Sequence, residues 1–435
     1  MESLPLGTRK RPLSFNSTAD SQASTRMKPS PTKLRKRPTH RARGVPIHWD
    51  EEQLRNLLAV QCDSADPDIR SLATEIDGRS RTATVDFQDM PASCQIALPD
   101  TPSRGSQPIR LDKDFLGITT LFKPPPQDHK VDIIAVCGLG GHAFGSFTER
   151  NGSHMWLRDA LPLDVPQEAD QKPFARVMIY GYESSLAQSE SFQNLEDLAT
   201  SFHTHLLGLV STSLPKPIIV IGHSLGGLVV KQTLISLSTS TKPDDKTLLQ
   251  AVYGLVFFGV PHDGMDIRSL IPMAGDGPNR FLLESLERTN SQILTIQQRE
   301  FPKAFGHKGR VFCFYETLKS PTALQVGGTW QMSGEPAVLV TKSSATRCVE
   351  AGSEHVCAVN RSHSEMVKFA PHDEEYKKSV ARIGELARRA VVAHPERAES
   401  KQITTYLTYL CSLDNCTDRL QSHYVLNSPW KHRIA

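Results

Sequence analysis

A serine between two glycines is the feature of this chain that most directly suggests chemistry. The sequence GHSLG, residues 222–226, follows an apolar, β-branched run at 218–221 and opens an apolar helical pattern. In that setting the pattern is typical of a nucleophile elbow, where a tight turn lifts the oxygen of Ser224 clear of a sheet. The turn also directs the backbone N–H of Leu225 toward the reacting atom. The alternative is an ordinary strand–glycine–helix connection without chemistry.

A serine hydroxyl becomes a nucleophile only when a base accepts its proton, and a carboxylate orients that base. After an elbow of this type the acid comes next in the chain, followed by the histidine. We expect His363 to be the base, because it follows a short strand-like run at 355–359 and precedes the last helical pattern. A surface histidine is the alternative reading, and His262 is the second choice of base. The candidates after the elbow are His262, His307, His355, His363, His372, His394 and two histidines in the C-terminal tail.

Glu316 is the expected acid. It follows the apolar run 311–315, so it should lie at the carboxyl end of a strand. Ligands and reacting groups collect at that end in open α/β sheets. A solvated loop glutamate is the alternative, and Asp263 and Asp266 are the competing acids, one strand earlier.

A glycine-rich loop follows the first strand-like run of this region. The sequence CGLGGH, residues 137–142, has three glycines in four positions, which lets backbone amides approach a substrate closely. A phosphate-binding loop is the alternative, but no G-K-[ST] follows and the spacing is not G-x-G-x-x-G. We therefore expect an oxyanion hole formed by the N–H groups of Leu139 and Leu225. This chemistry requires no metal and no cofactor.

The elements that must position these residues follow from the hydrophobic pattern. Near-continuous apolar strands that alternate with helices predict a mostly parallel sheet covered on both faces. The expected strands are 131–136, 175–180, 218–221, 252–260 and 311–315, and the expected helices are 191–206, the segment from the elbow to about 238, and 376–392. Residues 264–310 are expected to add helices over the site.

Composition narrows the class of protein. The chain has 435 residues with a net charge of +3 and eight cysteines. Residues 1–43 carry eleven Lys and Arg and two acids, so the remainder is mildly acidic (3 − 9 = −6) and nucleic-acid binding is not expected. No apolar run reaches the roughly 18 residues of a membrane span, and no transmembrane segment is expected. Cysteines in apolar strands suit a reducing, intracellular compartment, and the pair Cys411 and Cys416 does not indicate a zinc site.

The chain is expected to divide into four parts. Residues 1–43 should be a disordered basic tail, 44–122 a small α+β unit, 123–393 the α/β domain, and 394–435 a C-terminal tail with a helical stretch at 403–413. The order β-α-β-β in 44–122 is like that of an RNA-recognition domain (RRM), but the strand 81–87 lacks stacking aromatics, which favours a scaffold. The basic clusters at 9–12 and 33–38 indicate a nuclear import signal, a mitochondrial leader or a solvated tail.

The motifs of residues 131–393, taken in order, resemble a known family. They are similar to the lipase-like α/β-hydrolases grouped with the eukaryotic serine-active-site-containing protein. They are especially similar to the N-terminal hydrolase domains of fungal NACHT and ankyrin-repeat receptor-like proteins. The matching stretches are CGLGGH at 137–142, YGY at 180–182, GHSLGG at 222–227, FFGVPH at 257–262, FYET at 314–317, VLV at 338–340 with SSA at 343–345, and HSEMVKF at 363–369.

The resemblance implies an α/β-hydrolase fold with serine esterase or lipase activity and a triad of Ser224, Glu316 and His363. It also implies an acyl ester or lipid substrate, a part in lipid metabolism, and peripheral association with mitochondrial or endoplasmic-reticulum membranes. The family loop usually begins His-Gly, whereas Cys137 stands here, and the chain has no P-loop and no ankyrin period. The alternative function is therefore a signalling or interaction module that keeps the hydrolase fold with little or no catalysis.

Overall fold

The computed structural model describes residues 38–394, with several short stretches excepted. These are 63–66, 89–94, 99–107, 167–171, 187–188, 212–214, 269, 271–273, 276, 289–290, 307–309, 327–328 and 350–353. Some of the predictions therefore lie outside the described residues. They are the basic clusters at 9–12 and 33–37, His307, the helical stretch at 403–413, and the pair Cys411 and Cys416.

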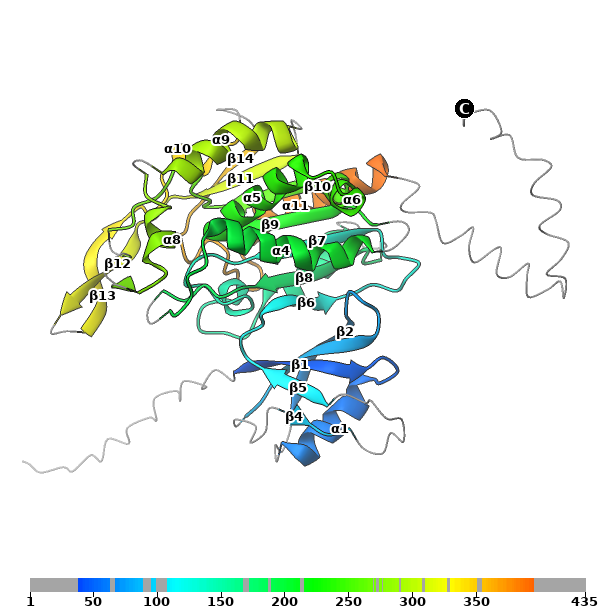
Figure 1. The fold of residues 1–435 in the computed structure, drawn as a ribbon. Helices are drawn as coiled ribbons and strands as arrows, with labels where there is room; N and C mark the ends of the chain where they lie inside the picture. Colours follow the sequence, from blue (N-terminus) through cyan, green and yellow to red (C-terminus); the bar gives the residue numbers. More distant parts are fainter. Residues whose placement is uncertain are drawn as a thin grey trace, which may run out of the picture. The chain divides into compact units, whose positions relative to one another are not determined.

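A seven-stranded sheet forms the centre of the larger part of the protein (Figure 1). Its strand order is β14-β11-β10-β9-β7-β8-β6, and every pairing is parallel except that of the edge strand β6 with β8. The strands are β6 (Gly117–Phe122), β7 (Val131–Val136), β8 (Ala175–Gly181), β9 (Ile218–His223), β10 (Val252–Phe258), β11 (Val311–Glu316) and β14 (Val356–Val359). The predicted mostly parallel sheet is confirmed.

Helices cover both faces of this sheet, which explains why its strands are apolar throughout. Every residue of β7, β8, β9 and β10 is buried. Figure 1 shows α4, α5 and α9 in front of the sheet and α11 behind it. The helices are α2 (Trp156–Asp159), α3 (Leu161–Asp164), α4 (Leu195–Val210), α5 (Leu225–Thr239), α6 (Pro243–Ala251), α8 (Arg280–Glu284), α9 (Gln292–Phe305), α10 (Lys342–Ala345) and α11 (Glu374–Ala393).

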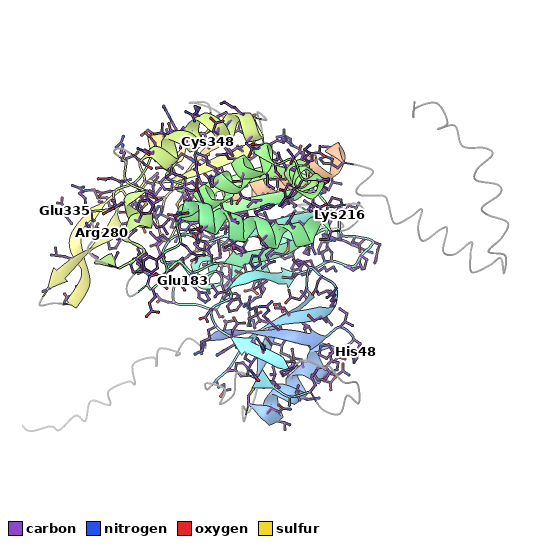
Figure 2. All side chains as sticks on the ribbon, viewed as in Figure 1. His48, Glu183, Lys216, Arg280, Glu335 and Cys348 are labelled. Atoms are coloured by element: carbon purple, nitrogen blue, oxygen red, sulfur yellow. The ribbon has the colours of Figure 1, made fainter. Side chains whose placement is uncertain are left out.

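A β-hairpin follows β11, and no sequence signal predicted it. Its strands are β12 (Ser320–Val326) and β13 (Thr329–Ala337), which pair with each other and with no other described strand. In Figure 2 the labelled Glu335 marks the hairpin at the edge of the protein. The hairpin therefore occupies most of the chain between the end of β11 and residue 339.

A second, five-stranded sheet precedes the larger one. Its order is β2-β3-β1-β5-β4, and the single helix α1 (Glu51–Gln61) packs on one face through Leu54 and Leu58. The strands are β1 (Thr39–Pro46), β2 (Asp68–Thr74), β3 (Ser80–Asp86), β4 (Gln95–Ile96) and β5 (Ile109–Asp112). The predicted β-α-β-β order is observed, and β1 lies between β3 and β5.

Two strands lie at the predicted boundaries of this small unit. β1 begins at Thr39, within the stretch predicted to be a tail, and its residues Ala42 and Val45 share a hydrophobic core with α1. β6 ends at the predicted boundary of residue 122, yet it pairs with β8 of the seven-stranded sheet. Ile118 and Leu121 of β6 belong to the core of that sheet, which accounts for its place there.

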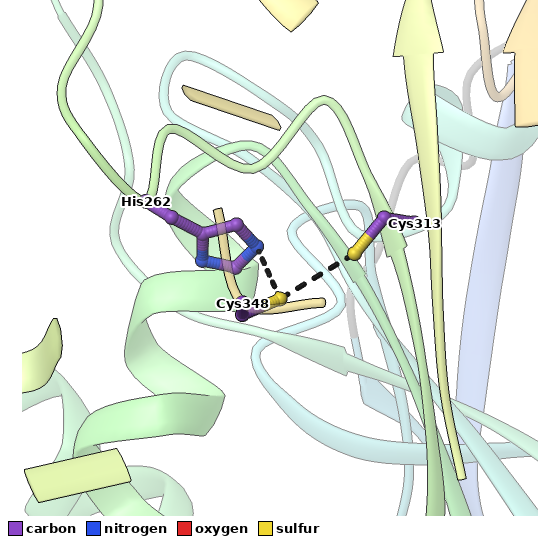
Figure 3. Close-up of side chains that lie close together, drawn as sticks. All are labelled: His262, Cys313 and Cys348. Atoms are coloured by element: carbon purple, nitrogen blue, oxygen red, sulfur yellow. Dashed lines mark hydrogen bonds between the residues drawn. The ribbon is translucent and has the colours of Figure 1, made fainter. Parts of the chain in front are cut away.

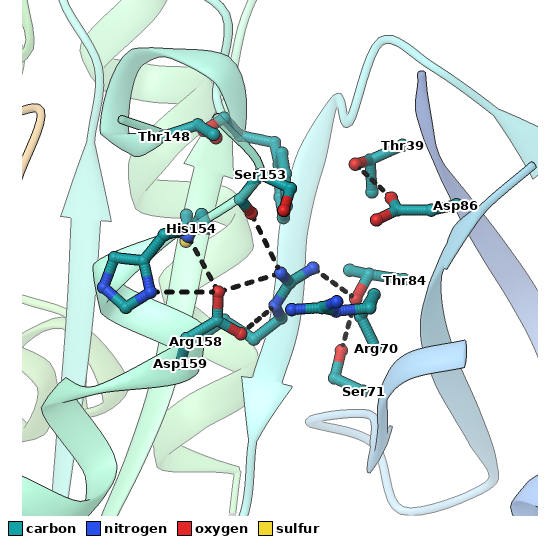
Figure 4. Close-up of polar contacts among 12 residues, drawn as sticks. Thr39, Arg70, Ser71, Thr84, Asp86, Thr148, Ser153, His154, Arg158 and Asp159 are labelled. Atoms are coloured by element: carbon teal, nitrogen blue, oxygen red, sulfur yellow. Dashed lines mark hydrogen bonds and ion pairs between the residues drawn. The ribbon is translucent and has the colours of Figure 1, made fainter. Parts of the chain in front are cut away.

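The face of the small sheet opposite α1 is covered by the larger part of the chain. Arg41 donates hydrogen bonds to Asp112 at 2.9 Å, to the carbonyl of Leu116 at 2.9 Å and to Thr119 on β6 at 2.7 Å. Arg158, from α2, reaches Thr84 of β3 at 3.2 Å while it pairs with the adjacent Asp159 (Figure 4). Since an RNA-recognition domain stacks bases on a corresponding open face, this face offers no platform for a base.

Candidate functional site

Ser224 lies on a strained turn between β9 and α5. Its backbone has φ 50° and ψ −128°, and φ > 0 is unusual for any residue except glycine. Its N–H donates to the carbonyl of Phe258 at 2.9 Å, which ties the turn to β10. A Cβ at Gly222 would lie 2.7 Å from the Cα of Gly227, and one at Gly226 would lie 2.3 Å from the carbonyl oxygen of Cys137. The glycines are therefore needed so that strand and helix can approach, as a nucleophile elbow requires.

His363 lies between the serine and the predicted acid. Its Nε2 is 2.9 Å from Ser224 Oγ, and its Nδ1 is 2.6 Å from Glu316 Oε2. All three residues are buried, with exposed fractions of 4% for Ser224, 6% for His363 and 3% for Glu316. With Nδ1–H donated to the carboxylate, Nε2 is left to accept the serine proton. This is the geometry in which a histidine serves as a general base.

The carboxylate of Glu316 is held by backbone groups beyond the hairpin. Its Oε1 accepts hydrogen bonds from the N–H of Leu339 at 2.8 Å and from the N–H of Val340 at 3.3 Å. Its Oε2 is then directed at His363. Three groups therefore hold this buried carboxylate in place, namely the two backbone N–H groups and the ring of His363.

The backbone of His363 is fixed by two side chains. Its N–H donates to the hydroxyl of Ser320 at 3.0 Å, and its carbonyl accepts a hydrogen bond from Nε2 of His223 at 3.0 Å. Burial lowers the pKa of His223 to about 3, so this side chain is neutral at physiological pH. His223 and Ser320 therefore position the imidazole without a charge of their own. Neither role was predicted from the sequence.

The glycine loop lies directly against Ser224. A Cβ at Gly138 would be 2.7 Å from the Cβ of Ser224. The N–H groups of Gly140 and Gly141 donate within the protein, to Ser184 at 2.6 Å and to Gly138 at 3.1 Å. The loop therefore packs against the serine, and Leu139 lies between Gly138 and the two glycines whose N–H groups are engaged within the protein.

Cys137 is the first residue of the loop 137–142, and its surroundings explain how this loop is held. The thiol is buried, and burial raises its pKa to about 12, so it is inert as a nucleophile. The carbonyl of Cys137 accepts a hydrogen bond from the hydroxyl of Tyr182 at 2.9 Å, and the hydroxyl of Ser184 donates to the carbonyl of Gly141 at 2.6 Å. The segment after β8 thus anchors the loop at both ends.

The competing residues take part in other contacts. Nε2 of His262 lies 3.2 Å from Cys348 Sγ, and the ring is fully buried. Asp263 accepts from Gln298 at 2.8 Å, and Asp266 pairs with Arg268 at 2.5 Å. The structure therefore brings Ser224, His363 and Glu316 together and does not bring these alternatives into hydrogen-bond contact with them.

The strand order, the antiparallel edge strand β6 and the elbow after β9 define the α/β-hydrolase fold. In comparisons with known proteins, no family model matches the chain. The chain is similar to Protein SERAC1 of Homo sapiens, with 26% identity over 216 residues that cover 44% of this chain and 31% of that protein. SERAC1 of Mus musculus is 29% identical over 150 residues, 32% of this chain and 22% of that protein. The matched region thus spans less than a third of these relatives.

Solved structures with some similarity are hydrolases. Lipase BlEst2 from Bacillus licheniformis is 13% identical with a TM-score of 0.34, covering 60% of this chain and 97% of the lipase. The type II thioesterase YbtT is 14% identical with a TM-score of 0.34, covering 63% of this chain and 98% of the thioesterase. Because these values are low, the fold assignment rests on the topology of this chain itself.

Two further findings concern a membrane and a metal ion as possible partners. Among the described residues, no helix has both the length and the apolar character that crossing a bilayer demands. Within the same residues, His262, Cys313 and Cys348 form a group whose ligand atoms are close enough together to bind a metal, and it shares no residue with the Ser224 site.

Proposed function

We propose that this chain is a serine hydrolase that cleaves acyl esters. The single observation that supports this most is the continuous contact from Ser224 through His363 to Glu316 on a strained elbow. Ser224 Oγ would attack the acyl carbon while His363 Nε2 takes its proton. Glu316 would stabilise the imidazolium that results.

The remaining steps follow from the same groups. The N–H groups of Leu225 and Leu139 would hold the oxyanion, because one opens α5 and the other lies in the loop that packs against Ser224. His363 would then return its proton to the leaving alcohol. A water activated by the same nitrogen would release the acid from the acyl-enzyme.

We infer a lipid-like substrate from apolar surface near the start of α4 and on α8. Phe192 and Phe281 are 84% and 68% exposed. Phe281 lines a hollow of about 420 Å³ together with Leu195, Ile293 and Ile296, and polar residues, among them Glu196 and Glu284, complete its lining. Exposed aromatic residues, one of them at a hollow with apolar and polar walls, suit an acyl chain with its polar head or the surface of a membrane. By resemblance, the membrane would be mitochondrial or that of the endoplasmic reticulum.

The test of the reaction is covalent labelling by a fluorophosphonate probe. We expect labelling of the wild type, none of Ser224→Ala, and full labelling of Ser236→Ala, which changes an exposed serine on the same helix. Folded wild-type protein that resists the probe would refute the proposal. It would favour the signalling module that keeps the fold without turnover.

The test of the substrate class compares p-nitrophenyl esters of short and long acyl chains. We expect Phe281→Ser to slow cleavage of the long ester several-fold and to leave the short ester unchanged, because under this proposal only a long chain would extend to the hollow that Phe281 lines. An equal effect on both esters, or none on either, would argue against a lipid-like substrate while leaving the hydrolase proposal intact.

A further inference from the structure

A second cluster of reactive side chains lies within the larger part of the chain, and the proposed hydrolase does not use it (Figure 3). Cys348 Sγ is 3.4 Å from Cys313 Sγ and 3.2 Å from His262 Nε2. Cys313 lies on β11, and Cys348 lies in the turn after α10. Cys313 is fully buried, whereas Cys348 is partly exposed. Of the two residues, Cys348 is the one that lies nearer to solvent.

A buried cation accompanies the two thiols. Lys231, on α5, is only 1% exposed, and its ammonium lies 5.1 Å from the centre of the Phe301 ring. Burial lowers the pKa of Lys231 to about 8, while both cysteines favour its charged form. A buried ammonium requires a nearby anion, because an unpaired charge in the interior is costly.

The charge of Lys231 distinguishes between two possible roles of the cluster, which are metal binding and thiol chemistry. A divalent metal bound by His262 and the two sulfurs would require both thiols to be ionised, so the charges of the metal and the sulfurs would cancel and Lys231 would gain no net anion. A single thiolate at Cys348, without a metal, would supply an anion for Lys231. The cluster therefore fits a reactive thiol better than it fits a metal ion.

The pKa values of the two cysteines are shifted in opposite directions, as a pair of one attacking and one resolving thiol requires. Burial by itself raises the pKa of Cys348, but the hydrogen bond with Cys313 and the proximity of His262 and Lys231 outweigh it and lower the pKa. The same hydrogen bond, together with burial, raises the pKa of Cys313. One thiol is thus prepared to attack, and the other stays protonated beside it.

We propose that Cys348 is a peroxide-reactive thiol that closes a disulfide with Cys313. The Cys348 thiolate would attack one peroxide oxygen, the O–O bond would break, and the other oxygen would leave as water after taking a proton from Lys231. The sulfur is oxidised to a sulfenic acid and the peroxide is reduced. Cys313 would then attack this sulfur, and the S–O bond would break. The second water forms with the Cys313 proton.

Little movement is needed for the second step. The two sulfurs must approach from 3.4 Å to about 2.0 Å. Cys313 is held by strand pairing on both sides, with β10 and with the edge strand β14, whereas Cys348 lies in a turn outside the strands. The turn that carries Cys348 is therefore the part that moves.

The experiment exposes the full chain to hydrogen peroxide and maps its thiols by mass spectrometry. We expect a peptide pair joined through Cys313 and Cys348 that dithiothreitol separates. In Cys313→Ser the sulfenic acid should persist on Cys348 and be trapped by dimedone. The matched control is Cys357. This residue is also partly exposed, but burial raises the pKa of its thiol. It should be trapped about tenfold more slowly than Cys348.

Three results would overturn this proposal. One is wild-type protein that forms no Cys313–Cys348 link in peroxide. Another is equal trapping of Cys357 and Cys348. The third is zinc that co-purifies in a one-to-one ratio and is lost in Cys348→Ser, because the thiols would then be metal ligands. The wild-type measurement needs no substitution, so it decides the matter even if a variant fails to fold.

Discussion

Replacing Glu316 by glutamine should leave the protein folded and nearly abolish the reaction at Ser224. Glu316 Oε1 accepts from the N–H groups of Leu339 and Val340, so the amide oxygen of glutamine should occupy that position. The amide NH₂ would then face His363 Nδ1 across the 2.6 Å contact. Two donors cannot share one hydrogen bond, so Nδ1 would lose its proton and Nε2 would carry it.

The expected size of the effect follows from this change of tautomer. A protonated Nε2 cannot accept the Ser224 proton, and the charge that stabilises the imidazolium is lost as well. An amide in the equivalent position of a serine-protease triad slows turnover about 10⁴-fold. That factor corresponds to ~5 kcal/mol of transition-state stabilisation.

The assay is the rate of fluorophosphonate labelling, followed by ester hydrolysis, with a melting curve to confirm folding. Glu365→Gln is the matched control, because this acid lies two residues beyond His363 and pairs with Lys368 at 3.0 Å instead. We expect the control to label at the wild-type rate. If folded Glu316→Gln labels within about tenfold of the wild type, the argument for the tautomer fails.

Three other outcomes concern the groups around the site. Ser320→Ala removes the acceptor of the His363 N–H, and we expect labelling about tenfold slower, or ~1.4 kcal/mol; an unchanged rate would show that the hydroxyl does not position the ring. Burial lowers the pKa of His223 from 6.5 to about 3, so the unfolded chain binds a proton in this range that the folded chain does not. The free energy of unfolding should therefore fall as pH drops through 6.5, by ~2 kcal/mol at pH 5. Urea unfolding at pH 7 and pH 5 should show a smaller loss of stability for His223→Gln than for the wild type. An identical loss in both proteins would contradict the assignment to His223. Gly226→Ala places a Cβ 2.3 Å from a backbone oxygen of the loop 137–142 and should prevent stable folding, so a soluble variant with the wild-type melting temperature would refute that crowding.

Much of the larger fold could be predicted because its strands are buried on both faces and read as continuous apolar runs. The runs 131–136 and 311–315 match β7 and β11 closely. The hairpin β12–β13 was missed because its sequence mixes polar and apolar residues with two prolines and a glycine, and because its strands pair only with each other. β6 was not predicted as a strand of the larger sheet, because its pairing with β8 spans more than fifty residues, which local pattern cannot show.

The three principal residues of the site were predictable because chain order and strand ends restrict the choice. Glu316 and His363 each follow a recognisable strand. In the structure His363 contacts both Glu316 and Ser224. Their catalytic role remains a prediction. Ser320 and the amide of Leu339 were not predictable, because they act from the ends of a hairpin whose existence the sequence did not reveal.

The two ends of that hairpin are tied to different members of the triad. Ser320 at its start holds the backbone of His363, and Leu339 just beyond its end holds the carboxylate of Glu316. Only the two ends of the hairpin are thus held by residues of the triad. The chain between these two ends makes no strand pairing with the main sheet. Lengthening such a connection costs only about 0.6 kcal/mol per doubling. The hairpin is consequently the place where a recognition segment or an engineered sensor peptide can be inserted while acid and base keep their spacing.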